Sequence, residues 1–238
     1  MSDKVVLYDL ANTQGTSWSP NPWKGTFTPP PLVVESLTAN PDLAPKFKAL
    51  GIPPNDPDAF AEYSSPTVRL ADGSYVMDTA KIVPKLEETY PEPSLHLTSP
   101  MNKEASELID ALLMALLPGV LPDVVNLLQE PSKSWFVEDR ERRLGMTLEA
   151  LAQKAGGEHG WQKAEPLLHR LKGLLEKNKD DAGPFILGSK PSFGDLVIVA
   201  MFEGMRKITR KNYDRLMGCD ASFQKLDEAC KPWTKKDD

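Results

Sequence analysis

The chain is poor in the residues that build disulfide frameworks and metal centres. Its 238 residues include two cysteines, Cys219 and Cys230, and three histidines, His96, His159 and His169. Both cysteines lie near the carboxyl end, and no histidine belongs to a cysteine or carboxylate ligand motif. Disulfide scaffolds and zinc sites need closely spaced ligands of these types. We therefore expect no metal site, no disulfide framework and a reduced, intracellular setting.

The sequence also lacks an excess of positive charge and long apolar runs. It holds 28 basic against 34 acidic residues, a formal charge of −6. Nucleic-acid surfaces need clustered Lys and Arg, whereas the basic stretches 140–143 and 207–211 are short, which favours solvated helix faces. No window approaches the roughly 20 apolar residues of a membrane span, and the amino terminus does not resemble a signal peptide. We expect no nucleic acid, no membrane and a cytoplasmic location.

What is present divides the chain into two halves. Most of the 22 prolines lie in the first hundred residues, where short extended segments and turns must dominate. The hydrophobic pattern predicts strands at 5–8, 32–34, 67–70 and 75–77 and helices at 41–50 and 78–90, and the Asp72-Gly73 pair predicts a hairpin. The remainder is helical. A long helix is expected around Leu108, Leu112 and Leu116, bent near Pro118 and Pro122, and further helices are expected at 135–155, at 161–175, from Ser192, at 211–217 and at 221–229. The pattern predicts an α+β chain with a mixed unit at 1–92, a linker at 93–100 and a helical unit at 101–238, whose charged end 235–238 is disordered.

One motif in the second half has a clear physical purpose. Ser192 is placed to cap a helix, and Asp195, three residues later, is placed to accept the N–H of the cap. The helix that follows is apolar on nearly every side at 196–200, so its end groups must be satisfied inside the core. The whole run at 183–195 resembles the cap of the core helix in glutathione transferases.

A second motif lies in the first half. Ser65-Pro66, a hairpin, and then Asp78-Thr79 opening a helix resemble the glutathione-binding side of that superfamily. The resemblance implies that Ser65, before a cis-proline at Pro66, pairs its backbone with the cysteinyl part of glutathione. It also implies that Asp78 and Thr79 hold the γ-glutamyl end, which suits a helix amino terminus, a hydroxyl and a carboxylate. The alternative is that Asp78 is simply a helix cap and Pro66 a turn proline.

A third motif narrows the resemblance. Residues 18–24, Trp-Ser-Pro-Asn-Pro-Trp-Lys, look like those of the fungal Fu-type glutathione transferases, which are related to bacterial ether-cleaving enzymes. The resemblance places Ser19 beside the glutathione sulfur as the catalytic residue, with Asn21 as its neighbour in the glutathione site. A serine hydroxyl that donates to a thiolate lowers the pKa of the thiol. Alternatively, the two tryptophans pack in the core and Ser19-Pro20 forms a turn.

The family pattern is interrupted after Lys24. Gly25 and the three prolines at 29–31 cannot sustain the long first helix of the family. The resemblance therefore implies a thioredoxin-like amino-terminal domain with a truncated first helix, followed by an all-α carboxyl-terminal domain, in a homodimer by analogy. A loss of catalysis, a site remodelled for a bulky substrate and an incorrectly spliced gene model each explain the truncation.

Two function classes follow from the resemblance. The first is a glutathione transferase that uses the glutathione thiolate on a small hydrophobic electrophile, by conjugation, ether cleavage or a step in secondary metabolism. Met114, Leu117, Leu121 and Trp135 are candidates to line the electrophile site. The second is a catalytically impaired protein of the same fold that binds hydrophobic ligands or a protein partner. A thiol–disulfide oxidoreductase is excluded because the end of the first strand has no cysteine.

Overall fold

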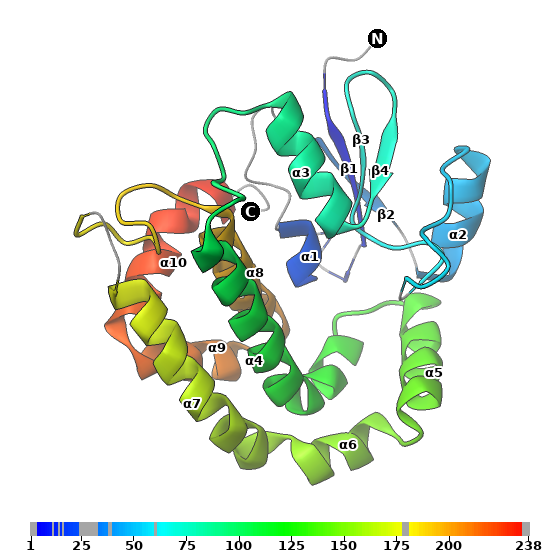
Figure 1. Cartoon of the computed structure of the whole chain (residues 1–238). Coiled ribbons are helices and arrows are strands. Elements are labelled where there is room, and N and C mark those ends of the chain that lie inside the picture. Colours follow the sequence, from blue (N-terminus) through cyan, green and yellow to red (C-terminus); the bar gives the residue numbers. More distant parts are fainter. Residues whose placement is uncertain are drawn as a thin grey trace.

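The chain folds into a small sheet unit that lies against a larger group of helices (Figure 1). The computed structural model describes residues 4–10, 12–13, 15, 17–23, 33–37, 40–59, 61–177 and 181–234. The elements in chain order are β1 (Val6–Leu10), α1 (Pro20–Trp23), β2 (Val33–Leu37), α2 (Asn40–Ala49), β3 (Thr67–Arg69), β4 (Tyr75–Met77), α3 (Thr79–Thr89), α4 (Pro100–Val125), α5 (Ser132–Leu144), α6 (Leu148–Ala155), α7 (Gly157–Glu176), α8 (Phe193–Ile208), α9 (Arg210–Cys219) and α10 (Ala221–Thr234).

The four strands form one sheet in the order β2-β1-β3-β4. β1 pairs parallel with β2 and antiparallel with β3, and β3 pairs antiparallel with β4. Side chains alternate between the two faces of a strand. Accordingly Tyr8 packs against Phe47 of α2 on one face, while Leu7 packs with Ile82 and Leu86 of α3 on the other. The sheet is thus covered on both faces.

The predicted hairpin forms between β3 and β4. The amide of Leu70 donates to the carbonyl of Ser74 at 2.8 Å, and the carboxylate of Asp72 accepts from the amide of Ser74 at 2.8 Å. Gly73 has φ of 89°, a conformation that a side chain would disfavour. The turn sets the register that brings β4 back alongside β3 and leads into α3.

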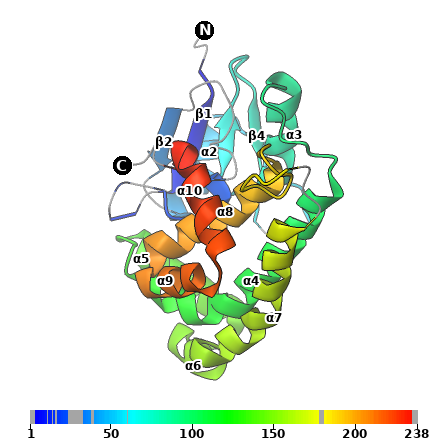
Figure 2. The ribbon, with the colours of Figure 1, turned by 90° about the vertical axis from the view of Figure 1, so that its left-hand side faces the viewer.

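The helical unit is centred on α8, which is buried along most of its length (Figure 2). Its predicted capping box forms, and the buried Asp195 carboxylate accepts from the amide of Ser192 at 2.8 Å and from that of Ile186 at 2.8 Å. Asn102 of α4 adds a bond that the sequence did not indicate, because its side-chain oxygen accepts from the amide of Gly194 at 2.8 Å. The amide nitrogen of Asn102 donates to the carbonyl of His96 at 2.7 Å, which ties the segment after α3 to the start of α8.

One helix corrects the expectation that no window is apolar enough to span a membrane. α4 is long and apolar enough by length and composition, with a mean hydropathy of 1.9 over its best window, 44% of which is buried. Its inner face packs against α6, α7 and α8. The core helix of a soluble protein passes the same test. Pro118 and Pro122 lie inside α4, and Figure 1 shows its carboxyl-terminal part bent, as expected.

Other element bounds differ from the predicted ones. The single helix predicted at 135–155 is wrong: α5 ends at Gly145, which has φ of 68°, and Thr147 caps a separate helix, α6. α3 starts at Thr79, one residue after the predicted start, and continues through Pro84 to Thr89. The prediction of a broken helix at 25–31 and that of a disordered end at 235–238 lie outside the described residues.

Candidate functional site

A polar pocket of about 570 Å³ lies between the sheet unit and α5. It brings together all six predicted site residues, which are Ser19, Asn21, Ser65, Pro66, Asp78 and Thr79. The wall opposite the sheet comes from α5, through Trp135, Phe136, Arg140 and Arg143. The amide of Asn40 at the start of α2 donates to the hydroxyl of buried Ser132 at the start of α5, at 3.2 Å, which joins the two walls.

Asp78 and Thr79 stand where β4 turns into α3. Asp78 has φ of 79°, and its carboxylate accepts from the amide of Ala80 at 3.0 Å. The cap interpretation of Asp78 is therefore correct, and it is compatible with a ligand because a carboxylate has a second oxygen. Asn21, Asp78 and Thr79 also line a neighbouring pocket of about 300 Å³ that extends to α4 and α8. A helix amino terminus and a carboxylate together fit a zwitterionic amino-acid group.

The Ser65–Pro66 peptide bond is cis, and Pro66 is buried. The hydroxyl of Ser65 donates to the carbonyl of Tyr8 at 3.3 Å. That hydrogen is used within the fold, so a ligand can meet the main-chain groups of Ser65 and the acceptor lone pairs of its hydroxyl oxygen. Asn55 holds the preceding loop, because its side-chain amide donates to the hydroxyl of Ser64 at 3.1 Å and to the carbonyl of Ala61 at 3.1 Å.

The described part of α1 places Ser19 just before Pro20, the first residue of the helix. α1 packs on α8 at Gly204, where an added Cβ would lie 2.9 Å from the Cγ of Pro20. The absence of a side chain at Gly204 therefore allows α1 to approach the core helix. Trp18 is 8% exposed and belongs to the core of the helical unit, in agreement with the packing interpretation of this tryptophan.

A second, mostly apolar pocket of about 290 Å³ adjoins the first. Its lining includes the predicted Leu117 and Leu121 of α4 together with Met201 and Met205 of α8. Met114 lies outside both pockets and is 73% exposed, and Trp135 lines the polar pocket instead. Four of the described residues line both pockets: Trp18, Ser19, Phe136 and Arg140. Ser19 therefore stands at the junction of a polar and an apolar chamber.

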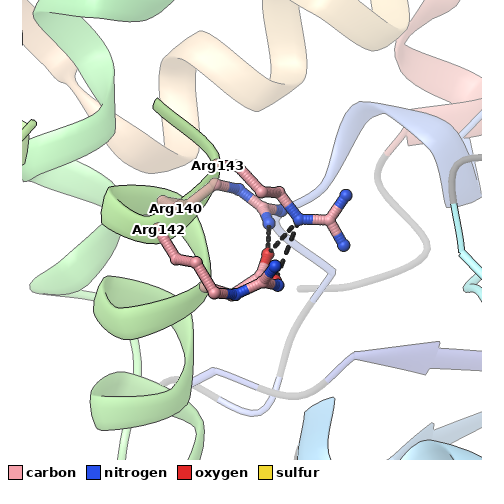
Figure 3. Close-up of polar contacts among 4 residues, drawn as sticks. Arg140, Arg142 and Arg143 are labelled. Carbon is pink, nitrogen blue, oxygen red and sulfur yellow. Dashed lines mark hydrogen bonds and ion pairs between the residues drawn. The ribbon is translucent and has the colours of Figure 1, made fainter. Parts of the chain in front are cut away.

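The stretch 140–143, predicted as a solvated helix face, contributes to the site instead. Asp139 of α5 is 6% exposed, and its carboxylate accepts from Arg140, from Arg142 at 2.6 Å and from Arg143 at 2.9 Å (Figure 3). Burial alone would raise the pKa of Asp139, but the hydrogen bond from Arg143 and the neighbouring guanidinium charges outweigh it and lower the pKa. Arg140 and Arg143 line the polar pocket, whereas Arg142 does not.

The two cysteines do not contribute to this site. Burial raises the pKa of the Cys230 thiol, and burial also raises that of Cys219 in spite of the nearby Arg215 charge. A thiol nucleophile needs a lowered pKa. In the described ranges, no group of three or more His, Cys, Asp or Glu residues is placed to hold a metal ion.

The sequence and the fold are similar to those of known proteins. The family described as glutathione S-transferase, C-terminal domain, matches residues 105–233, more than half of the chain. The glutathione S-transferase-like protein ustS of Aspergillus flavus is 27% identical over 221 residues, which cover 84% of this chain and 77% of that protein.

Two solved structures extend the comparison to the whole chain. Glutathione transferase GSTFuA3 of Phanerochaete chrysosporium superposes with a TM-score of 0.83 at 25% identity, covering 96% of each chain. A glutathione S-transferase of Ceriporiopsis subvermispora, solved in complex with glutathione, superposes with a TM-score of 0.72 at 24% identity, covering 93% of this chain and 97% of that one. The fold is thus a thioredoxin-like unit followed by a glutathione transferase helical unit, and the chain belongs to the glutathione S-transferase superfamily.

Proposed function

We propose that the protein binds glutathione in the polar pocket and joins its thiolate to a small hydrophobic electrophile in the apolar pocket. The observation that carries this proposal is the position of Ser19 in the lining that the two pockets share. A reaction between a polar thiol and an apolar partner needs both to meet at one point. The structure of a relative with bound glutathione supports the choice of co-substrate.

The proposed pose follows from the groups available in the polar pocket. Asp78 and the start of α3 receive the γ-glutamyl ammonium and carboxylate, with the Thr79 hydroxyl as a further donor. The main chain of Ser65 pairs with the cysteinyl residue. The sulfur then lies near Ser19, whose hydroxyl donates to the thiolate and lowers the pKa of the thiol. Asn21 lies beside Ser19 and Asp78 in the same lining.

The reaction that we propose is attack by the thiolate on an electrophilic carbon. The carbon–sulfur bond forms while the bond from carbon to the leaving group breaks, and the leaving group departs with its electron pair as an anion. A departing alkoxide or phenoxide then takes its proton from water. The site lowers the barrier by stabilising the thiolate and by orienting both reactants. Halide displacement and ether cleavage share this step. We expect the protein to act in the cytoplasm as a homodimer, without metal.

A second candidate is a catalytically impaired protein that binds hydrophobic ligands or a protein partner. It is favoured by the sequence after Lys24, where Gly25 and the prolines at 29–31 cannot sustain a long first helix. In that case the apolar pocket would bind ligands without any need for the glutathione thiolate.

Two measurements on the purified chain separate the candidates. The first is glutathione-dependent release of halide or phenol from a panel of activated aryl halides and aryl ethers. The second is displacement of a hydrophobic dye by the same compounds without glutathione. Turnover above the uncatalysed thiolate rate supports the transferase. Dye displacement without turnover by a folded protein would contradict the transferase and favour the second candidate.

A further inference from the structure

The indole of Trp18 is a hydrogen-bond donor to which the described part of the chain offers no acceptor. Trp18 is 8% exposed, and its Nε1 atom is closed to solvent. No described group accepts a hydrogen bond from this atom. A buried donor that has lost water and gained no partner is costly, and folded proteins hold few of them. The position of Trp18 gives this cost a reason.

Trp18 stands at the junction of the two pockets. It lines both the polar and the apolar pocket, and it directly precedes Ser19, which does the same. Among the described residues that line the apolar pocket, Trp18 is the one with a buried polar side-chain atom that has no partner. The unsatisfied donor therefore belongs to the wall of the chamber in which we place the electrophile.

The chamber itself does not satisfy this donor. Its described lining is hydrophobic apart from Ser19, Arg140 and Gly204. The guanidinium of Arg140 donates to Asp139 and carries no acceptor of its own. Met201 and Met205 of α8 line the same chamber, and methionine side chains are flexible and rearrange readily. A ligand that displaces them can bring an acceptor to the indole.

We propose that the indole N–H of Trp18 donates a hydrogen bond to an uncharged oxygen of the electrophile, so that the preferred substrates are small hydrophobic compounds with a carbonyl beside the reacting carbon. This inference rests on the proposed function and specifies its substrate class. The oxygen lies close to the reacting carbon because Trp18 and Ser19 share the junction. An uncharged acceptor suits the chamber, since a charge costs more to bury.

The hydrogen bond provides discrimination as well as affinity. A carbonyl oxygen accepts the indole hydrogen and satisfies Trp18. A hydrocarbon electrophile of the same shape leaves the donor unsatisfied. A site built for a polar group discriminates strongly against analogues that lack that group.

Binding of glutathione conjugates tests the inference without requiring turnover. The pair is S-phenacylglutathione and S-(2-phenylallyl)glutathione, which share shape and differ in that a C=CH₂ group replaces the C=O group. Each is titrated calorimetrically into the full chain, into Trp18→Phe and into Trp161→Phe. Trp161 is a matched control, because it is 7% exposed, belongs to the same core cluster and lines neither pocket.

The expected result is that the wild type binds the ketone conjugate at least about tenfold more tightly than the alkene conjugate. Trp18→Phe keeps an aromatic ring but removes the N–H, so it should abolish this preference, whereas Trp161→Phe should retain it. Equal affinities in the wild type would overturn the inference. A preference that persists in Trp18→Phe would do the same, because another donor would then hold the oxygen. The wild-type comparison stands even where a variant does not fold.

Nuclear magnetic resonance reads the donor directly. The chain has five tryptophans, and the indole N–H signal that Trp18→Phe lacks belongs to Trp18. A new hydrogen bond to oxygen should move this signal downfield when the ketone conjugate binds and not when the alkene conjugate binds. A signal that moves equally with both conjugates would overturn the inference, whatever the affinities.

Two further outcomes identify other sources of failure. If the N–H of Trp18 serves glutathione itself, Trp18→Phe weakens glutathione and both conjugates equally, which overturns the inference. If the folded wild type binds neither conjugate and no glutathione, the proposed function fails and the inference fails with it. Binding of glutathione and of both conjugates without discrimination leaves the function standing and removes only the substrate class.

Discussion

At the scale of single residues, the site depends on short polar groups held by unusual backbone. Asp78 adopts φ of 79° and caps α3 while it lines the polar pocket. Ser65 directs its hydroxyl to Tyr8 and precedes a cis-proline. The roles of Asp78 at the start of a helix and of Ser65 before a cis-proline could be predicted from the sequence, because each residue belongs to a local motif. Arg140 was not predicted as a site residue, because its role depends on how α5 packs against the sheet unit.

Ser19→Ala tests the residue nearest the proposed reaction. Loss of the hydroxyl removes a hydrogen bond to the thiolate, so the pKa of bound glutathione should rise by about one unit. Turnover of an aryl halide should fall about tenfold below that pKa and recover at higher pH, with little change in glutathione affinity. The pH profile of kcat/KM measures both effects. Ser19→Thr keeps the hydroxyl and should retain the wild-type profile, whereas an unchanged profile in Ser19→Ala would exclude the role of Ser19.

At the scale of elements, the contact between α1 and α8 positions the site. Gly204→Ala would place a Cβ 2.9 Å from the Cγ of Pro20, so α1 must shift and carry Ser19 with it. We expect kcat/KM to fall about tenfold or more, since small misplacements of reacting groups are costly. Gly173→Ala in α7 is the matched control, because nothing lies within 4 Å of its added Cβ. It should raise the free energy of unfolding by about 0.5–1 kcal/mol and leave activity unchanged.

The buried cap of α8 should dominate the stability of the helical unit. Asp195→Ala removes the acceptor of two buried amides and of the Ser192 hydroxyl, so we expect a loss of about 3 kcal/mol or more. The midpoint and slope of urea unfolding measure it. Asp181→Ala removes an acceptor of the Gly183 amide and the Ser189 hydroxyl in the exposed preceding turn, and it should cost less. Equal losses would contradict the central role of the buried cap.

The helices and strands also show which structural features could be predicted from the sequence. Local signals predicted the hairpin, α2, α3 and the cap of α8, because turn and cap residues act within a few positions of each other. The break between α5 and α6 was missed, although Gly145 and Thr147 mark it, because the hydrophobic periodicity continues across it. The bond between Asn102 and Gly194 joins residues 92 positions apart, so no local pattern could indicate it.

At the scale of the whole molecule, buried acids away from the site should make stability depend on pH. Burial raises the pKa of Asp227, and the hydrogen bond from Tyr213 offsets this only in part. Because the pKa of Asp227 is higher in the folded than in the unfolded protein, protonated Asp227 stabilises the folded state. This contribution is complete below the unfolded pKa of about 3.9 and is lost as pH rises through the folded pKa. Asp227→Asn cannot ionise, so it does not lose this stability as pH rises, and its amide oxygen still accepts from Tyr213. Its stability relative to the wild type should therefore grow between pH 4 and neutrality.

Asp220 provides a control of opposite sign. Hydrogen bonds from Lys172 and from the amide of Ser222 lower the pKa of Asp220 to about 2. Its contribution is present above the unfolded pKa of about 3.9 and is lost as pH falls toward the folded value. Asp220→Asn should thus be less stable than the wild type at neutral pH and approach it in acid. Urea unfolding across pH measures both differences, and trends of the same sign in the two variants would contradict the assignment.

The central claim is that the polar pocket binds glutathione, and calorimetric titration of the folded chain tests it most directly. We predict a dissociation constant between micromolar and millimolar. Asp78→Asn retains a cap oxygen for Ala80 but loses the charge that meets the γ-glutamyl ammonium, so it should weaken binding about tenfold or more. No heat of binding from a folded wild-type protein, or equal affinity in Asp78→Asn, would contradict this account of the site.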